Sequence, residues 1–317
     1  MQSLAKRRVL VVDDEERVTR ILDAILRDEY SVQVCNDPIE ALKLVRSTFF
    51  HVVISDQRMP QMDGSEFLRR AKEISAASIR ILLTGYSDLH AIVDSLNEGE
   101  IFRFVRKPWR TDEIRDIVRE AAEISAQTVD AIRSARISRP GPLESSRDFQ
   151  DLGDVLVLDG DAEILRMIGN QQPEFVVHHA TSVARALDIL AEFRIAIVVS
   201  EMFVGGESSA RLLRLLKLEY PHILIILASS ALDSEGATQL INYVQVFRFV
   251  PKPVRPGLLR QNIRSAYSRY KEFSRVPQLA KRHVVARSES VPASESALWR
   301  RVRQFVGTLR LARDRAQ

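Results

Sequence analysis

Acidic side chains follow two short apolar segments in the first part of this 317-residue chain. Asp13 and Asp14 come directly after the apolar run 9–12, and Asp56 comes after the run 51–55. Three carboxylates that are brought together repel one another unless a cation lies among them. Mg²⁺ suits such a set because it is a hard cation that takes oxygen ligands and keeps several waters. These residue types predict a magnesium site if the fold brings the three carboxylates together.

Two further side chains at the ends of apolar segments suit phosphoryl chemistry. Thr84 ends the run 79–84 with a hydroxyl group that can donate a hydrogen bond, and Lys107 follows the run 101–105 with a positive charge. A divalent ion can neutralise the charge that develops on a transferring phosphoryl group. Asp56 would then be the nucleophile and would form an acyl phosphate. The predicted chemistry is acceptance of a phosphoryl group, with positioning and charge stabilisation as its main requirements.

The elements that must position these residues are short strands alternating with helices. The apolar segments are continuous, which is typical of strands covered on both faces. Alternating strands and helices predict βαβ units, a parallel sheet and a doubly wound α/β domain. In such a sheet, ligands bind beyond the carboxyl ends of the strands, where the acidic residues lie. The strands are expected at 8–12, 31–35, 51–55, 79–84 and 101–105, and the helices near 16–28, 37–47, 64–75, 88–98 and from 112 onward.

The chain repeats this pattern at a spacing of about 145 residues. Residues 102–108 return as residues 247–253 with six identities in seven positions, and the run 9–13 returns as 155–159. Matches of this kind at corresponding places in each half indicate a tandem duplication, in agreement with a length that suits two domains. The strands of the second half are expected at 155–159, 175–180, 195–200, 223–228 and 246–250.

The last helix of the first half carries a long apolar stripe. Its members recur at steps of three and four residues and are Ile114, Ile117, Val118, Ala121, Ile124, Thr128 and Ile132. The stripe favours a dimerising coiled coil or a rigid strut, and an ordinary amphipathic helix that bends back onto its own domain stays open as the alternative. Pro140 and Pro142 end the helix. The domains are therefore expected at 1–137 and 152–273, joined by a linker at 138–151 and followed by a tail at 274–317.

The acidic residues and their neighbours identify a family resemblance. Asp13, Asp14, Asp56, Thr84 and Lys107, with Phe104 three positions before the lysine, resemble the receiver domains of two-component response regulators. The segment 55–64, Ser-Asp-Gln-Arg-Met-Pro-Gln-Met-Asp-Gly, looks like the phosphorylation loop of that family. The resemblance covers about residues 7–125. It implies a flavodoxin-like five-stranded sheet of order 2-1-3-4-5 and a histidine kinase as phosphodonor.

The resemblance also implies a role for each matching residue. Asp56 would be the phosphoacceptor, and Mg²⁺ would be the cofactor. Singly, an Asp at such a position often caps a helix, and a residue such as Phe104 is more often core than switch; the combination carries the inference. The implied metal ligands are Asp13, Asp14, Asp56 and the backbone carbonyl of Arg58, and the implied switch and phosphate-binding residues are Thr84, Phe104 and Lys107.

The second half retains the pattern but not the acceptor. Glu201 stands in place of Asp56, and Gly160 stands in place of Asp14, flanked by Asp159 and Asp161. The fold class expected is therefore two doubly wound receiver domains in tandem, of which the second is degenerate. An inert pseudo-receiver that serves as an interaction surface is the favoured interpretation, and a Glu201 that imitates a phosphorylated acceptor stays open. The residues that match the switch and phosphate-binding set are Ser229, Phe249 and Lys252.

The expected partners follow from the same resemblance. The donor is a sensor histidine kinase or a phosphotransfer protein, and the output is contact with a downstream protein or a homodimer. The chain is expected to be a regulator and not an enzyme, with at most self-phosphorylation from small phosphodonors and auto-dephosphorylation. An unphosphorylated docking scaffold is the alternative.

The tail gives a further alternative for the output. Residues 271–317 hold 11 Lys and Arg against 4 Asp and Glu, so the rest of the chain has a small negative charge although the whole carries +4. A short amphipathic helix at 298–309, or a disordered extension, is expected there. Binding of nucleic acid or a membrane surface through this tail is less favoured but possible in principle. No run of 18 apolar residues occurs, and Cys35 is the single cysteine, which indicates a cytoplasmic protein without a membrane span.

Overall fold

The structure is a computed structural model in which two compact units are described separately. It describes residues 6–85, 101–137, 153–160, 162–169, 175–229, 242, 244–275, 277, 279 and 280. The first unit contains the elements from β1 to α5, and the second contains those from β6 to α10. The predicted helix at 88–98, the linker at 138–151 and nearly all of the tail lie outside the described residues.

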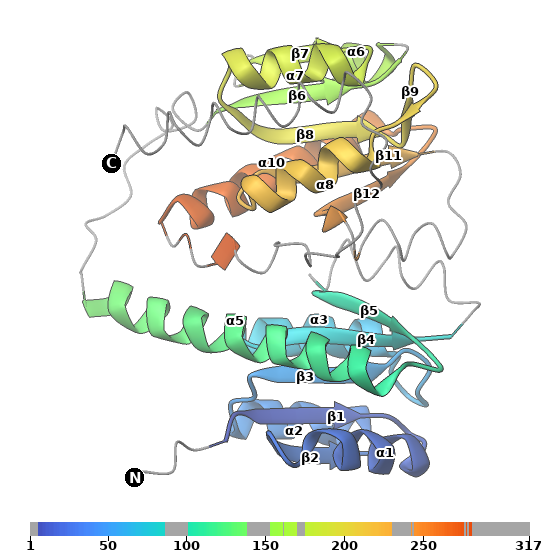
Figure 1. The fold of residues 1–317 in the computed structure, drawn as a ribbon, viewed down its shortest axis with the longest axis vertical. Coiled ribbons are helices and arrows are strands. Elements are labelled where there is room, and N and C mark those ends of the chain that lie inside the picture. Colours follow the sequence, from blue (N-terminus) through green and yellow to red (C-terminus); the bar gives the residue numbers. More distant parts are fainter. Residues whose placement is uncertain are drawn as a thin grey trace. The chain divides into compact units, whose positions relative to one another are not determined.

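The first unit is built on a five-stranded parallel sheet (Figure 1). The order is β2-β1-β3-β4-β5, as the family resemblance implies. The order reverses between β1 and β3, so the loops after these two strands diverge and leave a crevice at the carboxyl edge. The strands are β1 (Arg8–Val12), β2 (Ser31–Cys35), β3 (Val52–Asp56), β4 (Ile79–Thr84) and β5 (Arg103–Arg106).

Helices cover both faces of this sheet. The helices α1 (Glu16–Leu26) and α5 (Thr111–Ile137) lie on one face, while α2 (Pro38–Ser47) and α3 (Gly64–Ile74) pack against each other on the opposite face. Covering both faces explains why the strands are continuous apolar runs: every residue of β3 and β4 is buried.

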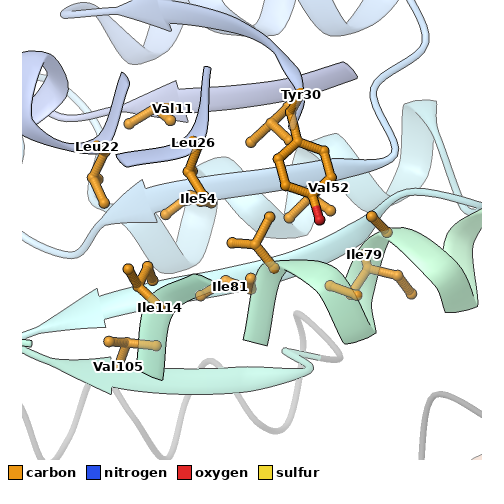
Figure 2. Packing of buried hydrophobic residues seen from close by; sticks show 14 of the residues in the cluster. Val11, Leu22, Leu26, Tyr30, Val52, Ile54, Ile79, Ile81, Val105 and Ile114 are labelled. Atoms are coloured by element: carbon orange, nitrogen blue, oxygen red, sulfur yellow. The ribbon is translucent and has the colours of Figure 1, made fainter. Parts of the chain in front are cut away.

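An apolar cluster between the sheet and the α1–α5 layer holds the unit together. Figure 2 shows Leu22 and Leu26 of α1 pointing toward Ile54 and Ile81 of the central strands, with Ile114 of α5 beside them. These side chains are almost completely buried, and each contributes about 1.5–3 kcal/mol through removal of apolar surface from water. The cluster fixes β1 and β3 relative to each other, and with them the loops at their ends.

Aspartate caps decide where α2 and α3 begin. The Asp37 carboxylate accepts from the backbone N–H groups of Ile39 (2.7 Å) and Glu40 (3.2 Å), with Pro38 at the first helical position. Asp63 accepts from the N–H of Glu66 at 3.0 Å. These caps satisfy donors that have no partner within the helix. The α3 cap places the N-terminus of that helix directly after the loop that follows Asp56.

The second unit repeats the strand order of the first. Its sheet is parallel with the order β7-β6-β8-β11-β12, which is the same 2-1-3-4-5 pattern counted from β6. The helices are α6 (Glu163–Gly169), α7 (Val183–Glu192), α8 (Ala210–Glu219) and α10 (Pro256–Arg275). The strands are β6 (Asp154–Leu158), β7 (Val177–Ala180), β8 (Ile195–Glu201), β11 (Leu224–Ser229) and β12 (Arg248–Pro251).

A small hairpin distinguishes the second unit. The strands β9 (Phe203–Val204) and β10 (Glu207–Ser208) pair antiparallel across Gly205 and Gly206, which have φ of 59° and 82°. Positive φ at both central residues is the requirement of a tight hairpin turn, and glycine meets it without strain. The sequence showed only that this loop departs from the one after Asp56, and the hairpin itself was not predicted.

Two boundaries in the first unit differ from the expected ones. The strand β3 ends at Asp56, one residue later than expected, so this aspartate is the last residue of the strand and not the first of the loop. The strand β5 begins at Arg103, two residues later than the predicted start. Within the described parts of the chain, none of the helices is apolar over a stretch long enough to cross a membrane.

Candidate functional site

The crevice of the first unit holds three carboxylates. Asp13 and Asp14 follow β1, and Asp56 ends β3; one carboxylate oxygen from each lies within 4.8 Å of the others. The two strands are neighbours, with Val12 aligned to Ser55, so the residues that follow them emerge side by side. The structure therefore brings together three of the residues that the sequence singled out.

The three carboxylates differ in exposure. Asp13 is fully buried, the Asp56 residue is 7 % exposed, and Asp14 is exposed. Burial raises the pKa of Asp13, and this effect outweighs the hydrogen bonds from Lys107 and from the Glu15 N–H, which lower the pKa. The pocket is thus open to solvent on the side of Asp14 and closed behind Asp13.

Lys107 spans the two buried carboxylates. Its Nζ lies 2.5 Å from Asp56 Oδ1 and 2.8 Å from Asp13 Oδ2. Burial lowers the pKa of Lys107, but the hydrogen bonds and charges of the two aspartates outweigh this and leave the pKa raised. The lysine is therefore charged at neutral pH.

The charge balance of the pocket fits a divalent cation. Three ionised carboxylates and one ammonium group leave two uncompensated negative charges among oxygen donors. Oxygen donors with this excess of negative charge are the set that Mg²⁺ prefers. Asp13, Asp14 and Asp56 are the described side chains that would hold the ion.

Backbone groups fix the acceptor and its lysine. The Asp56 Oδ2 atom accepts from the N–H of Arg58 at 2.8 Å, while Oδ1 is bound to Lys107. The Lys107 N–H donates to the Thr84 carbonyl at 2.9 Å, which ties the start of the lysine loop to the end of β4. Both oxygens of Asp56 therefore have a defined orientation.

Thr84 and Phe104 lie on the same face of the sheet on adjacent strands. Leu82 is aligned with Phe104, and Thr84 with Arg106, so the alternation of side chains places Thr84 and Phe104 on one side. Both are buried, with exposed fractions of 1 % and 2 %. Phe104 is thus part of the packed interior in this structure, and Thr84 lies at the carboxyl edge near the acidic pocket.

Gly64 closes the loop after Asp56. A Cβ atom at this position would lie 1.9 Å from the Asp56 backbone oxygen, and the Gly64 N–H donates to the Gln57 carbonyl at 2.9 Å. No other residue type fits without movement of the backbone that carries Asp56. The glycine therefore serves the close approach of α3 to the end of β3.

Two polar side chains near the pocket were missed by sequence reasoning. The Ser55 hydroxyl donates to the Asp56 carbonyl at 2.8 Å, and Asn36 Nδ2 donates to the Asp13 carbonyl at 2.7 Å. Asn36 directly follows β2, the neighbour of β1, so its position after a strand was the available signal. For Ser55 the sequence gave no signal, because a serine inside an apolar run carries no mark of its partner.

The corresponding pocket of the second unit is chemically different. Asp159 follows β6 and Glu201 ends β8, with Leu158 aligned to Ser200 as Val12 is to Ser55. Gly160 replaces Asp14, and Asp161 lies outside the described residues. Among the residues described for this unit, no cluster of three metal-ligating side chains is present.

The remaining residues of the second site match their counterparts in position. The Lys252 N–H donates to the Ser229 carbonyl at 2.9 Å, as Lys107 does to Thr84. Phe249 is 6 % exposed and aligned with Leu227. The lysine Nζ bonds to Glu201 Oε1 and lies 3.8 Å from Asp159 Oδ1.

The fold and pocket of the first unit define a doubly wound α/β domain with an acidic, cation-compatible site at its switch point. Residues 9–119 match the family model of the response regulator receiver domain. This part of the chain is a response regulator receiver domain.

Curated relatives are similar over the same region. The hydrogenase transcriptional regulatory protein HoxA of Bradyrhizobium diazoefficiens is 35% identical over 116 residues, which are 37% of this chain and 24% of the relative. The transcriptional regulatory protein ZraR of Salmonella typhimurium is 30% identical over 160 residues, 50% of this chain and 36% of the relative. The matched part of the chain thus corresponds to between a quarter and little more than a third of these proteins.

A solved structure is also similar. The signal receiver domain of an HD domain-containing protein from Pseudomonas fluorescens Pf-5 is 34% identical with a TM-score of 0.39, and the match covers 41% of this chain and 96% of that one.

Proposed function

We propose that the first unit accepts a phosphoryl group on Asp56, with Mg²⁺ bound by the acidic pocket, and that the chain is a regulator in a two-component phosphorelay. The observation that carries the proposal is the placement of Lys107 between Asp56 and Asp13 beside a third carboxylate. The donor is a histidine kinase or a phosphotransfer protein. Similarity to response regulators over residues 9–119 supports this assignment.

The transfer needs little beyond positioning. A carboxylate oxygen of Asp56 attacks the phosphorus, a P–O bond forms, and the bond from phosphorus to the donor nitrogen or oxygen breaks. The leaving group keeps the electron pair and takes up a proton from solvent. Mg²⁺, when bound, neutralises charge on the phosphoryl oxygens. Lys107 is placed to leave its carboxylate partner and bind a phosphoryl oxygen.

Nearby groups complete the assignment. Asp13 and Asp14 are the metal carboxylates, and the backbone carbonyl of Arg58 is a further metal ligand. The Thr84 hydroxyl turns toward the phosphoryl group and Phe104 responds on the same face of the sheet, as the adjacent positions of the two side chains allow. Asp56 ends each transfer modified, so the unit is a phosphoacceptor and not a catalyst for other substrates, apart from self-phosphorylation and auto-dephosphorylation.

The test is incubation of the full chain with acetyl phosphate and Mg²⁺, followed by intact mass measurement. We expect a gain of about 80 Da, the mass of one phosphoryl group, that maps to Asp56 and is lost on addition of a chelator before the donor. Asp56→Ala should abolish the gain, and Glu201→Ala should leave it unchanged. Absence of the gain in the wild-type chain, or its persistence in Asp56→Ala, would contradict the proposal.

The second unit is proposed to be a degenerate receiver that acts through contacts. Its parallel sheet of the same strand order and the matching register of Glu201 and Asp56 support this. The output would then be contact with a downstream protein or a second copy of the chain. A pull-down that compares the wild type with Asp56→Ala, with and without phosphodonor, would identify partners that depend on phosphorylation.

Nucleic-acid binding is a second candidate output. The relatives HoxA and ZraR are named transcriptional regulatory proteins, and residues 271–317 of this chain are strongly basic. Binding of DNA by the full chain should weaken steeply as salt rises if the tail makes phosphate contacts. Loss of DNA binding on neutralisation of Arg300, Arg301 and Arg303 would support this output, and salt-independent binding would speak against it.

A further inference from the structure

The longer acidic side chain of the second unit reaches across its own pocket. Glu201 occupies the register position of Asp56 but has one more methylene group. One carboxylate oxygen bonds to Lys252 Nζ, and the other lies 3.5 Å from the backbone nitrogen of Gly160. The glutamate therefore contacts both the lysine and the loop after β6 that would otherwise face a bound ion.

This reach changes the partner of the lysine. In the first unit, Lys107 contacts both carboxylates, at 2.5 and 2.8 Å. In the second unit, Lys252 bonds to Glu201 but lies 3.8 Å from Asp159. Asp159, which is fully buried, thus loses most of the compensation that its counterpart Asp13 receives.

A proton supplies the missing compensation. The side chains of Asp159 and Glu201 are hydrogen-bonded to each other, which requires one carboxyl proton between them. With Gly160 in place of a third carboxylate, two acidic groups and one lysine leave an excess of a single negative charge. One proton removes that excess, whereas a divalent cation would overcompensate it.

Burial determines which carboxyl group holds the proton. Burial raises the pKa of Asp159 to about 6, and Glu201 acts in the same direction. Burial also raises the pKa of Glu201, whose side chain is 21 % exposed, but the hydrogen bonds from Lys252 and Asp159 outweigh this and leave its pKa lowered. The proton therefore belongs to Asp159, with Glu201 as the acceptor.

Few other polar groups among the described residues face this pair. From β7, His179 Nε2 lies 3.0 Å from the Asp159 backbone carbonyl, and from α6 the Ile164 N–H lies 3.4 Å from Asp159 Oδ2. His178 pairs with Asp154 at 2.7 Å at the start of β6, away from the carboxyl edge. His179 is the titratable neighbour that a test must separate from the acid pair.

We propose that the pocket of the second unit is closed by its own Glu201 and holds a proton shared with Asp159 in the place of Mg²⁺, so that this unit responds to pH and not to metal or phosphodonor. The inference rests on the proposed function only for the comparison with Asp56, since its evidence lies in the second unit. The ion pair of Glu201 with Lys252 stands where a phosphoryl group would meet the lysine. The unit is therefore held in one ligand-like state above and below the titration, with a looser Asp159 loop when the proton leaves.

The test measures hydrogen exchange of the full chain between pH 5 and 7.5. We expect exchange in peptides that contain residues 155–164 to rise roughly tenfold relative to Asp159→Asn across this range, which corresponds to about one pKa unit of linkage. The ratio to the variant at each pH removes the intrinsic pH dependence of exchange. Glu201→Gln should lose most of the rise, and His179→Gln should keep it.

The same samples with Mg²⁺ and beryllofluoride separate this inference from the proposed function. These probes should protect peptides around residues 52–62 and leave those around 155–164 unchanged. A double variant, Gly160→Asp with Glu201→Asp, restores the carboxylate pattern of the first unit and should gain Mg²⁺-dependent protection there. A pH response that is the same in the wild type and Asp159→Asn, or Mg²⁺-dependent protection of the wild-type second unit, would overturn the inference. Failure of the response at 52–62 alone would count only against the function of Asp56.

Discussion

Asp13 illustrates how one residue combines a structural and a chemical demand. Its carboxylate is buried, accepts from the Glu15 N–H at 2.9 Å and binds Lys107, while its backbone carbonyl accepts from Asn36. These contacts hold the carboxylate rigidly next to Asp56. A rigid ligand contributes more to metal affinity than the exposed Asp14, because less freedom is lost when the ion binds.

We therefore predict that Asp13→Asn weakens Mg²⁺ binding by at least about tenfold, since one ionic ligand is lost. Trp109, which packs partly buried against the core two residues after Lys107, provides a fluorescence signal for the titration. Asp14→Asn should have a smaller effect, and Asp159→Asn should have none. An equal affinity in Asp13→Asn and wild type would show that the metal lies elsewhere.

Lys217 is a second residue whose environment controls its charge. It lies fully buried in α8, its Nζ bonds to the carbonyls of Pro221 and Ile223, and burial lowers its pKa to about 7. The unfolded chain binds this proton more tightly than the folded chain between pH 7 and the ordinary pKa of lysine. The stability of the second unit should therefore rise with pH from about 7 to 10.

Lys217→Met should flatten this dependence, because no titrating group remains at the site. Urea unfolding followed by hydrogen exchange of the α8 peptide at pH 7 and pH 9.5 measures the difference. The variant leaves two carbonyls without their donor, at about 1–3 kcal/mol. Its stability at pH 9.5 is thus expected below that of the wild type, and an undiminished pH slope would refute the role of Lys217.

At the scale of elements, the junction of β3 and α3 is the tightest part of the first site. The helix begins at Gly64, and its Asp63 cap and the Gly64–Gln57 hydrogen bond bring it directly against the carbonyl of Asp56. The loop 57–63 is therefore short and strongly constrained. Its geometry fixes where the N–H of Arg58 meets the acceptor carboxylate.

Gly64→Ala should destabilise the first unit by about 1–3 kcal/mol and slow phosphorylation of Asp56, because the added methyl group displaces the strand end. Gly257→Ala in α10 is the matched control: a Cβ there meets nothing within 4 Å, and alanine favours helix. Denaturant unfolding and the rate of mass gain with acetyl phosphate measure both effects. Equal stability in the two variants would contradict the close contact.

The strands of both units were predictable to within about two residues because continuous apolar runs carry a strong signal. The order of the sheets came from the family resemblance, since periodicity does not specify which strands are neighbours. The hairpin after Glu201 was missed because its two strands are only two residues each. The pairing of Lys252 with Glu201 in preference to Asp159 was also beyond the sequence, because it depends on side-chain reach and burial.

At the scale of the whole chain, two units of one strand order carry different charges in equivalent pockets. The first has three carboxylates around one lysine, and the second has two described carboxyl groups and a shared proton. Duplication of the fold has thus preserved the sheet and the lysine loop while changing the acceptor position. Metal and phosphodonor should accordingly act on only one of the two units.

Mg²⁺ with beryllofluoride should raise the stability of the first unit alone, by about 2.7 kcal/mol at a concentration one hundredfold above the dissociation constant. Thermal unfolding followed by Trp109 fluorescence reports the first unit, and hydrogen exchange of the α8 peptide at each temperature reports the second. Asp56→Ala should lose the shift. Stabilisation of both units to the same extent would show that they unfold together.

The position of β3 in its sheet has a consequence for how a signal spreads. This strand has β1 on one side and β4 on the other, and all its residues are buried, so Asp56 is attached to the stiffest part of the domain. Arg58 and Lys107, in contrast, belong to connecting segments at the rim. Modification of Asp56 should leave the acceptor itself almost stationary, and displacements should grow outward from it through the surrounding loops.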